Sequence, residues 1–334
     1  MSLLRRAAAA AAVTSLAVVG WAVPASSVDD PATTPTGYVT VSSEAGCELA
    51  VIDLQDGAVT DLPAEPAEEA CVADLAVSTS GVVYGIRNGF GSSSEKGLLA
   101  EYQAQLVTFS MDGAPTVTQI VDGKGQPAGS LYNGGIAVSP AGAVYVQVMT
   151  WDPTCGLGEE GSGTMLEGVA SPVCLFSVDP ATGVATPIGS GSDDLPEVPF
   201  EGLAWCSGLG TIVWADGPVW ATQSTSTGAV TLGTELAVDP FGYDCDSADG
   251  GPVYALGSPG NDLNGPGGYE AQLLAVDPAT GTATVVAALS DPDAFVENLG
   301  VVPSPSSAPA PTSTTTTGPP AAAQAASVTP AFTG

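Results

Sequence analysis

The sequence contains nearly the same fourteen residues twice, as LFSVDPATGVATPI at 175–188 and as LLAVDPATGTATVV at 273–286. Each copy has an apolar run, a polar turn ending in glycine and a second β-prone run, which is the pattern of a β-hairpin. Glycine suits that turn because short hairpin turns commonly force one residue to a positive φ. Weaker copies begin at Leu49, Leu106 and Val219, and the five turn glycines are Gly57, Gly113, Gly183, Gly228 and Gly281.

A second kind of hairpin alternates with the first. Its copies begin at Asp74, Gly135, Gly202 and Gly242. If its strands are called a and b, and those of the first hairpin c and d, the order a-b-c-d recurs about every 40 to 70 residues. Such a period is typical of the four-stranded blades of a β-propeller.

The two ends of the repeat region complement each other. The first strand, GYVTVSS at 37–43, is b-like and has no strand a before it, whereas FVENLGVV at 295–302 is a-like and has no b after it. Joined, they make one blade. The sequence therefore predicts an all-β fold, a five-bladed β-propeller over 37–302 that is closed by pairing of its N- and C-terminal strands.

The segments outside 37–302 have different compositions. Residues 1–25 combine a basic start, an apolar run and small residues, which is typical of a secretory signal peptide, with a membrane anchor as the alternative. Residues 26–36 form a short linker. Residues 303–334 are rich in Pro, Thr and Ala and predict a disordered stalk. Its final PAFTG resembles a sortase sorting pentapeptide, with a plain linker as the alternative.

Charge and composition exclude several classes of function. Without Arg5 and Arg6, three cationic residues oppose 36 acidic ones, a net formal charge of −33. Such a surface repels phosphate, so we expect no nucleic-acid partner. The chain has no histidine, which excludes Ser-His-Asp catalysis and histidine metal sites. We expect no membrane insertion after signal cleavage and a monomeric, extracellular protein, secreted or associated with the cell wall.

The segment YVTVSSEAGCELAVIDLQDGAVTDL, at 38–62, resembles the YVTN-type repeat of bacterial surface propellers. The blades with DPATG turns look like those of other secreted propellers, so the chain as a whole resembles proteins with YVTN- or NHL-like blades. The resemblance covers the blade-forming residues of 37–302. It implies an architecture and carries over no catalytic residue.

Six cysteines in an exported chain indicate disulfides, and no Cys-x-x-Cys motif occurs. Six cysteines allow 15 pairings. We propose one set from their places in the repeats. Cys155–Cys174 closes the longest insertion, Cys206–Cys245 joins neighbouring a strands, and Cys47–Cys71 links the terminal blade to the next.

Long connections gather on one face of the predicted propeller. The b–c connections are long at 88–102, 150–172 and 257–269, and in this architecture b–c and d–a loops leave the same face. Because loops on a rigid scaffold carry function, this face is the predicted binding face; drift of loop length is the alternative.

Polar residues begin the a strands on that face. The aligned segments read ADLAV, GGIAV, EGLAW, FGYDC and ENLGV. They place five candidate binding residues near the mouth of the central channel: Asp74, Glu201, Asp244, Glu297 and Asn298. Carboxylates brought together suit Ca²⁺, and well-hydrated acids at a water-filled opening are the alternative. The loop DCDSADG also offers Asp244, Asp246 and Asp249 as weak calcium ligands, although Asp and Gly need no metal in a turn.

Two functions compete. The first is an exported, non-catalytic binding or interaction module with an unknown extracellular glycan or protein as its partner and no required cofactor. The second is a glycoside hydrolase, since paired carboxylates suffice for that chemistry without histidine. Asp74, Glu201, Asp244 and Glu297 are its candidate catalytic residues.

Overall fold

The structure is a computed structural model of the whole chain. It describes residues 35–43, 45–62, 66–90, 102–111, 113–125, 134–149, 173–192, 202–206, 211–216, 219–236, 240–245, 253–257, 271–277, 280–289 and 295–303. These residues belong to one compact unit, Thr34–Gly334.

The described strands form five four-stranded antiparallel sheets. Sheet 1 contains β4 (Asp74–Val77), β5 (Val83–Phe90), β6 (Tyr102–Ser110) and β7 (Gly113–Gln119). Sheet 2 contains β8 (Ile136–Val138), β9 (Val144–Met149), β10 (Val173–Val178) and β11 (Ala185–Ser192). Sheet 3 contains β12 (Ala204–Cys206), β13 (Thr211–Asp216), β14 (Val219–Gln223) and β15 (Val230–Glu235). Sheet 4 contains β16 (Pro240–Cys245), β17 (Val253–Gly257), β18 (Gln272–Asp277) and β19 (Thr282–Ala288).

The remaining sheet, called here the terminal sheet, is built from both ends of the strand region. It has the order β20 (Phe295–Val301), β1 (Thr36–Ser43), β2 (Gly46–Asp53) and β3 (Val59–Asp61). β1 pairs antiparallel with β20, from Gly37 opposite Val301 to Ser42 opposite Phe295. The predicted pairing of 37–43 with 295–302 is therefore present. A short 3-10 helix, η1 (Glu68–Ala70), leads from this sheet toward β4.

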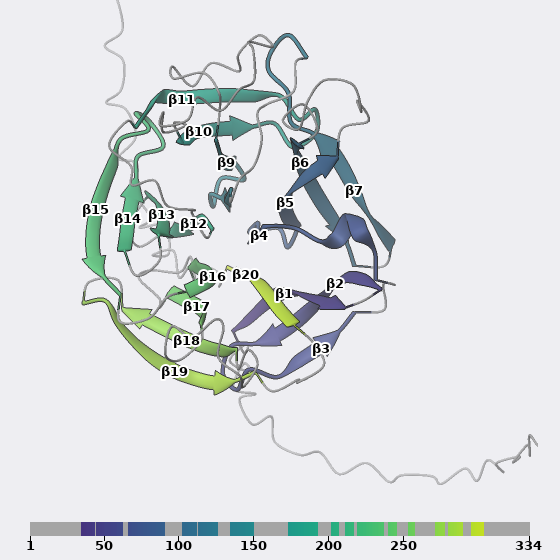
Figure 1. Cartoon of the computed structure of the whole chain (residues 1–334), viewed down its shortest axis with the longest axis vertical. Helices are drawn as coiled ribbons and strands as arrows, with labels where there is room; N and C mark the ends of the chain where they lie inside the picture. The colour runs from purple at the N-terminus through teal and green to yellow at the C-terminus, as the bar shows by residue number, and fades with distance from the viewer. Residues whose placement is uncertain are drawn as a thin grey trace, which may run out of the picture. The chain divides into compact units, whose positions relative to one another are not determined.

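The sheets have a propeller-like arrangement (Figure 1). The a strands β4, β8, β12, β16 and β20 lie innermost, and the d strands β3, β7, β11, β15 and β19 lie at the periphery. Each a strand contacts the a strand of the next sheet, in the order β4, β8, β12, β16, β20 and again β4. The structure confirms the predicted all-β class.

Apolar side chains fill the space between neighbouring sheets. One cluster joins Ile86 and Leu106 of sheet 1 to Val146 and Phe176 of sheet 2. These four side chains are fully buried, and each contributes about 1.5–3 kcal/mol through removal of apolar surface from water. A single four-stranded sheet has no partner for its second face, so packing against neighbours is what makes the repeat stable.

The turn glycines explain why the DPATG hairpin is repeated. Gly57, Gly183, Gly228 and Gly281 have φ values of 73°, 73°, 71° and 69°, as predicted. A Cβ on Gly183 would collide with the Gln119 carbonyl of sheet 1, and one on Gly228 would collide with the Ile188 carbonyl of sheet 2. The c–d turn thus packs against the d strand of the preceding sheet.

Gly113 does not follow this pattern. It is the first residue of β7 and pairs with Ser110. The turn of this hairpin therefore lies before Gly113, and the prediction that Gly113 is the turn glycine was wrong.

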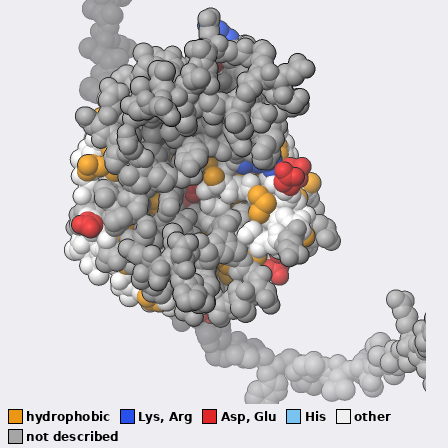
Figure 2. Space-filling model, in the orientation of Figure 1, with side chains coloured by type: hydrophobic (Ala, Val, Ile, Leu, Met, Phe, Trp, Pro, Cys, Tyr) orange, Lys and Arg blue, Asp and Glu red, His pale blue; other side chains and the backbone are white. Residues whose placement is uncertain are grey.

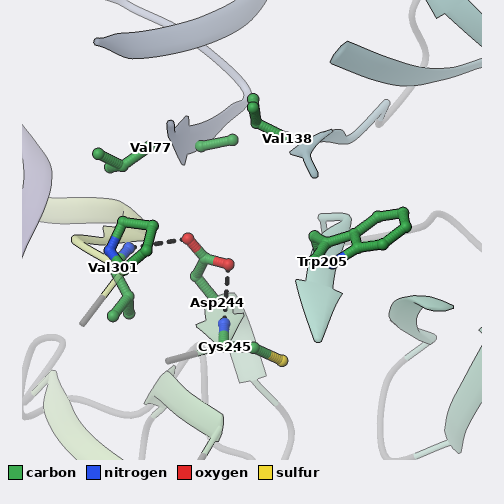
Figure 3. A pocket seen from close by; sticks show the side chains of 8 residues that line it. Val77, Val138, Trp205, Asp244, Cys245 and Val301 are labelled. Atoms are coloured by element: carbon green, nitrogen blue, oxygen red, sulfur yellow. Dashed lines mark hydrogen bonds between the residues drawn. The ribbon is translucent and has the colours of Figure 1, made fainter. Parts of the chain in front are cut away.

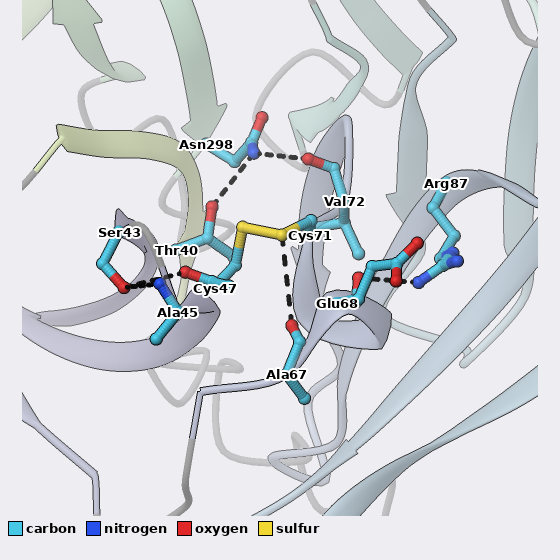
Figure 4. Close-up of a disulfide and its surroundings, with 11 residues drawn as sticks. Thr40, Ser43, Ala45, Cys47, Ala67, Glu68, Cys71, Val72, Arg87 and Asn298 are labelled. Atoms are coloured by element: carbon cyan, nitrogen blue, oxygen red, sulfur yellow. Dashed lines mark hydrogen bonds between the residues drawn. A yellow bond between two sulfur atoms is a disulfide. The ribbon is translucent and has the colours of Figure 1, made fainter.

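Two of the predicted disulfides are confirmed. Cys47–Cys71 has its Cα atoms 4.9 Å apart and links β2 to the segment after η1 (Figure 4). Cys206–Cys245 has its Cα atoms 5.1 Å apart and links β12 to β16. Cys174 is also disulfide-bonded, and its predicted partner Cys155 lies outside the described residues.

The ends of the chain are not part of this description. β1 begins at Thr36 and β20 ends at Val301. The predicted signal peptide, nearly all of the linker and nearly all of the stalk lie outside the described residues. In the part of the chain that the structure describes, no helix has the length and hydropathy of a membrane span.

Candidate functional site

Asp74, the first residue of β4, connects three sheets. Its side chain is buried, with 1% of its surface exposed. Its Oδ1 accepts a hydrogen bond of 2.9 Å from the Leu75 amide. Its Oδ2 accepts hydrogen bonds of 2.8 Å from the Ile136 amide and 2.9 Å from the Leu203 amide. Ile136 begins β8 and Leu203 directly precedes β12, so one carboxylate holds backbone of sheets 1, 2 and 3.

The unpaired edges of the a strands explain why a buried carboxylate binds backbone of three sheets. An a strand pairs with strand b on one side only. Its other side presents backbone N–H groups that no neighbouring strand accepts. A buried N–H without a partner costs about 1–3 kcal/mol. A carboxylate at the axis can accept several such groups from different sheets at once, which neither a backbone carbonyl in a ladder nor an apolar side chain can do.

Asp244 also accepts hydrogen bonds from the backbone of two sheets, here sheet 4 and the terminal sheet. It lies on β16 and is 7% exposed. Its Oδ1 accepts a hydrogen bond of 2.7 Å from the Cys245 amide, and its Oδ2 accepts one of 2.8 Å from the Val301 amide of β20 (Figure 3). Asp244 therefore ties sheet 4 to the terminal sheet.

Asn298 connects the terminal sheet to the segment between η1 and β4. It is 6% exposed and is the bulged residue of β20, because Val39 faces Leu299 while Thr40 faces Glu297. Its φ is 55°, in the left-handed region, which Asn adopts more readily than most residues. Its Nδ2 donates to Thr40 Oγ1 at 3.1 Å and to the Val72 carbonyl at 2.9 Å (Figure 4).

Burial sets the ionisation of Asp74. Desolvation raises the pKa of its carboxyl well above the usual range. The three backbone donors oppose this shift because they favour the charged form, and the negative charge of Asp244 adds to it. Asp244 is thus close enough to raise the pKa of Asp74.

One column of the a-strand alignment shows where the backbones of neighbouring a strands approach each other closely at the axis. Asp74, Gly135, Gly202, Gly242 and Asn298 hold the same position in the five segments. A Cβ on Gly135 would lie 2.5 Å from Leu203 Cβ, and one on Gly242 would lie 3.1 Å from Asn298 Cα. Gly202 has a φ of 123°, a backbone conformation that favours glycine. The three glycines of the column thus have steric or conformational reasons, and the other two positions carry side chains that bond to backbone.

Asp74 and Asp244 are not hydrated acids at an open channel mouth, which was the alternative to calcium binding, because both are buried. Asp74 and Asp244 are buried because they accept the edge N–H groups of the a strands. Asn298 is buried for a related reason. Whether any of the three also binds a ligand stays a prediction. Glu201, Asp246 and Asp249 lie outside the described residues, as does the side chain of Glu297. Among the residues that are described, no group of three or more acidic or cysteine side chains is placed to hold a metal ion.

A small pocket lies among the ends of the a strands (Figure 3). Its lining comes from all five of them and includes Val77, Val138, Trp205, Asp244 and Val301. Its free volume is about 10 Å³, which is about the minimum for one water molecule. As built by these residues, the pocket does not admit a sugar.

The sequence analysis missed a polar stripe across sheet 1. Arg87 on β5 pairs with Gln105 on β6, which pairs with Gln119 on β7. Directly opposed residues project from the same face of a sheet. The Gln105 amide donates to Gln119 Oε1 at 3.4 Å, and the Gln119 amide donates to the Ala104 carbonyl at 3.0 Å. The one usable signal in the sequence was that Arg87 is the only arginine after residue 6.

Within the described part of the chain, Arg87 is held by a backbone carbonyl. Its Nη1 donates to the Glu68 carbonyl at 2.7 Å (Figure 4). Its Nε is buried without a hydrogen-bond partner. No ion pair of Arg87 occurs among the described residues, although acidic side chains appear at several separate places on the face in Figure 2.

Comparisons with known proteins concern the fold only. No protein-family model matches the chain, and no curated protein matches it. A structure of a putative TolB from Agrobacterium tumefaciens is 13% identical, with 80% of this chain and 87% of that chain covered and a TM-score of 0.43. A putative 6-phosphogluconolactonase from Bacteroides uniformis is 13% identical, with coverage of 75% and 82% and a TM-score of 0.39. A chain of a nidogen–laminin complex is 12% identical, with coverage of 80% and 98% and a TM-score of 0.41.

These scores are too low to transfer a function. The propeller-like architecture rests on the strand pairing of the chain itself. The resemblance to YVTN- and NHL-like blades stays a prediction.

Proposed function

We propose that the chain is an exported, non-catalytic binding module: a closed five-bladed propeller that binds an extracellular partner through its b–c and d–a loops. The observation that supports this most is that the polar side chains at the axis bond to the protein's own backbone. The side chains of Asp74, Asp244 and Asn298 form hydrogen bonds with backbone groups of neighbouring parts of the ring. The axis thus acts as a scaffold, and recognition falls to the loops.

Ring closure is supported by two findings in the terminal sheet. Strands from both ends of the chain pair there, and the a strands contact one another in cyclic order. Export is supported by the disulfides Cys47–Cys71 and Cys206–Cys245, since disulfides persist in oxidising compartments. A bacterial cell surface is the location that the predicted stalk and the YVTN-like segment suggest.

The glycoside hydrolase alternative gains no support from the described carboxylates. That chemistry needs two carboxyl groups roughly 5–10 Å apart with open space between them for a sugar and, in inverting enzymes, a water. Asp74 and Asp244 are both buried, and both oxygens of each accept backbone hydrogen bonds. We therefore favour the module without catalysis.

A binding screen of the full chain against glycans and cell-wall fragments tests the proposal. Replacement of 258–270 by a short Gly/Ser linker should abolish or weaken binding of any partner that the screen finds. The matched control changes the exposed turn at the opposite end of sheet 1, with Thr79→Ala and Ser80→Ala, and should bind normally. Release of sugar from the glycans by the unmodified chain would overturn the proposal, as would equal loss of binding in the control.

A further inference from the structure

We propose that the outer edge of β19 is a docking site for an extended peptide of a partner protein, with cationic residues on both sides of a β-prone core. The site is separate from the b–c and d–a loops, so the inference goes beyond the proposed function and does not depend on it. β19 is the outermost strand of sheet 4 (Figure 1) and, among the described strands, pairs only with β18. Its other edge presents backbone N–H and C=O groups to which an added strand can bond.

The other d strands have features that oppose such pairing, whereas β19 has few. Short length, charge and proline at a sheet edge hinder the addition of a further strand, and glycine weakens a strand. β3 has only three residues and ends with an acid, β7 and β11 contain proline, and β15 ends with an acid after a glycine: Asp61, Pro115, Pro187, Gly233 and Glu235. β19 has seven residues, TATVVAA, without a charge, a proline or a glycine. A bulge at Val286 leaves 282–285 in regular register.

The side chains along β19 are accessible. Thr282, Thr284, Val285 and Ala288 are exposed, Val285 with 54% of its surface. Threonine and valine favour extended backbone and pack well against the side chains of an adjacent strand. The seven residues of β19, at about 3.3 Å each, make an edge of about 23 Å. A peptide of the same length can therefore pair along it.

Acidic residues lie at both ends of this edge. Asp277 is exposed and pairs with Thr282, the first residue of β19. At the other end, a Cβ on Gly57 would lie 2.6 Å from Ala287 Cβ. The turn that contains the exposed Asp56 thus packs against the end of β19. A peptide with Lys or Arg on each side of its β-prone core complements the charge at both ends.

Charge also disfavours two other occupants of the edge. Two copies of the chain, each with a net formal charge of −31, repel each other. Residues 303–334 of the chain itself contain no Lys or Arg, so they lack the groups that match Asp56 and Asp277. The edge therefore fits a cationic segment of another protein better than it fits either of these.

The peptide KTVTVTVTK, labelled with a fluorophore and added to the full chain, tests the inference. Its control ETVTVTVTE reverses the terminal charges, and KTVTPTVTK interrupts the added strand with proline. We expect saturable binding of KTVTVTVTK by fluorescence anisotropy, and about ten-fold or slower exchange of the outward-facing amides of β19 when it is bound. Both control peptides should bind at least about ten-fold more weakly. No saturable binding, or equal binding of all three peptides, would overturn the inference.

Two substitutions by lysine are matched in charge and exposure. Val285→Lys places a cation on the β19 edge, which opposes strand addition, and should weaken binding of KTVTVTVTK about ten-fold or more. Leu232→Lys makes the same change at a position of β15 that is 57% exposed, and it should change binding by less than about two-fold. Asp56→Asn combined with Asp277→Asn should weaken binding about two-fold or more at low salt. That difference should vanish in 1 M salt, where charges are screened beyond about 3 Å.

Three results with these proteins would contradict the docking site. The first is full binding by Val285→Lys, or an equal loss in Leu232→Lys. The second is slow exchange of the outward-facing β19 amides before any peptide is added, which would show that another segment of the chain covers the edge. The third is a dimer in sedimentation that Val285→Lys dissociates, which would make a second copy the occupant. None of these results bears on binding through the loops, so the proposed function is tested separately.

Discussion

Replacement of Asp74 should destabilise the protein far more than replacement of any exposed aspartate. Asp74→Ala removes the acceptor of the Leu75, Ile136 and Leu203 amides. Each buried donor left without a partner costs about 1–3 kcal/mol, so the expected total is roughly 3–9 kcal/mol. Because domains of this kind are stable by only about 5–15 kcal/mol, Asp74→Ala should fold poorly or unfold at low denaturant.

Asp74→Asn gives a graded version of the same experiment. An amide oxygen in place of Oδ2 can still accept from Ile136 and Leu203, but the amide nitrogen would face the Leu75 N–H. One hydrogen bond is lost and two donors are opposed, which should cost about 1–3 kcal/mol. Asp277→Asn is the matched control, because Asp277 is exposed in a DPATG turn and should change stability little.

The pH dependence of this loss follows from the raised pKa of Asp74. The folded state keeps the proton of Asp74 at pH values where the unfolded chain has lost it. Its contribution to the free energy of unfolding is therefore largest near or below the unfolded pKa of about 4 and falls as the pH rises toward the folded pKa. The deficit of Asp74→Asn should thus be larger near pH 4 than near pH 7.

Urea unfolding followed by tryptophan fluorescence measures these differences. The midpoint should fall in the order Asp277→Asn, Asp74→Asn, Asp74→Ala, with similar m-values for all variants that fold. If Asp74→Ala unfolds at the same urea concentration as Asp277→Asn, the carboxylate does not hold the sheets together. The structural interpretation of the axis would then be refuted.

Three further substitutions test other parts of the fold. Asn298→Ala should lower the melting temperature more than Asn298→Gly, since glycine keeps the positive φ of 55° while both lose the side-chain hydrogen bonds. Gly183→Ala should destabilise more than Gly81→Ala in urea melts, because both have positive φ but only Gly183 meets the neighbouring sheet; equal losses would contradict the packing argument. The double change Cys47→Ser with Cys71→Ser should lower stability by about 2–5 kcal/mol without loss of the β-sheet signal in circular dichroism, whereas a fully unfolded circular dichroism spectrum would contradict this.

Most of the strand order could be predicted because each hairpin carries its own signal. A turn glycine between two β-prone runs is local information, and repetition reinforced it. The pairing of β1 with β20 was predictable as well, since the first and last strands are complementary parts of one repeat. The disulfide Cys206–Cys245 followed from the same alignment, which places both cysteines on neighbouring a strands.

The burial of the axial acids could not be predicted in the same way. The amides that bind Asp74 belong to residues 62 and 129 positions away in sequence, so no local pattern specifies them. The alignment column with Gly135, Gly202 and Gly242 held a partial signal, because glycine at one position of successive repeats indicates close backbone approach. Arg87 was missed because the sequence does not show which groups its side chain contacts.

Hydrogen exchange at the axial amides tests the central claim most directly. The amides of Leu75, Ile136, Cys245 and Val301 lie on strands that have a ladder partner on one side only, and that of Leu203 directly precedes such a strand. If Asp74 and Asp244 bind them, these amides should exchange on the order of 100-fold or more slowly than unstructured ones in the unmodified protein. Exchange close to the rate of an unfolded chain at these positions would contradict the claim that the two carboxylates hold the sheets together.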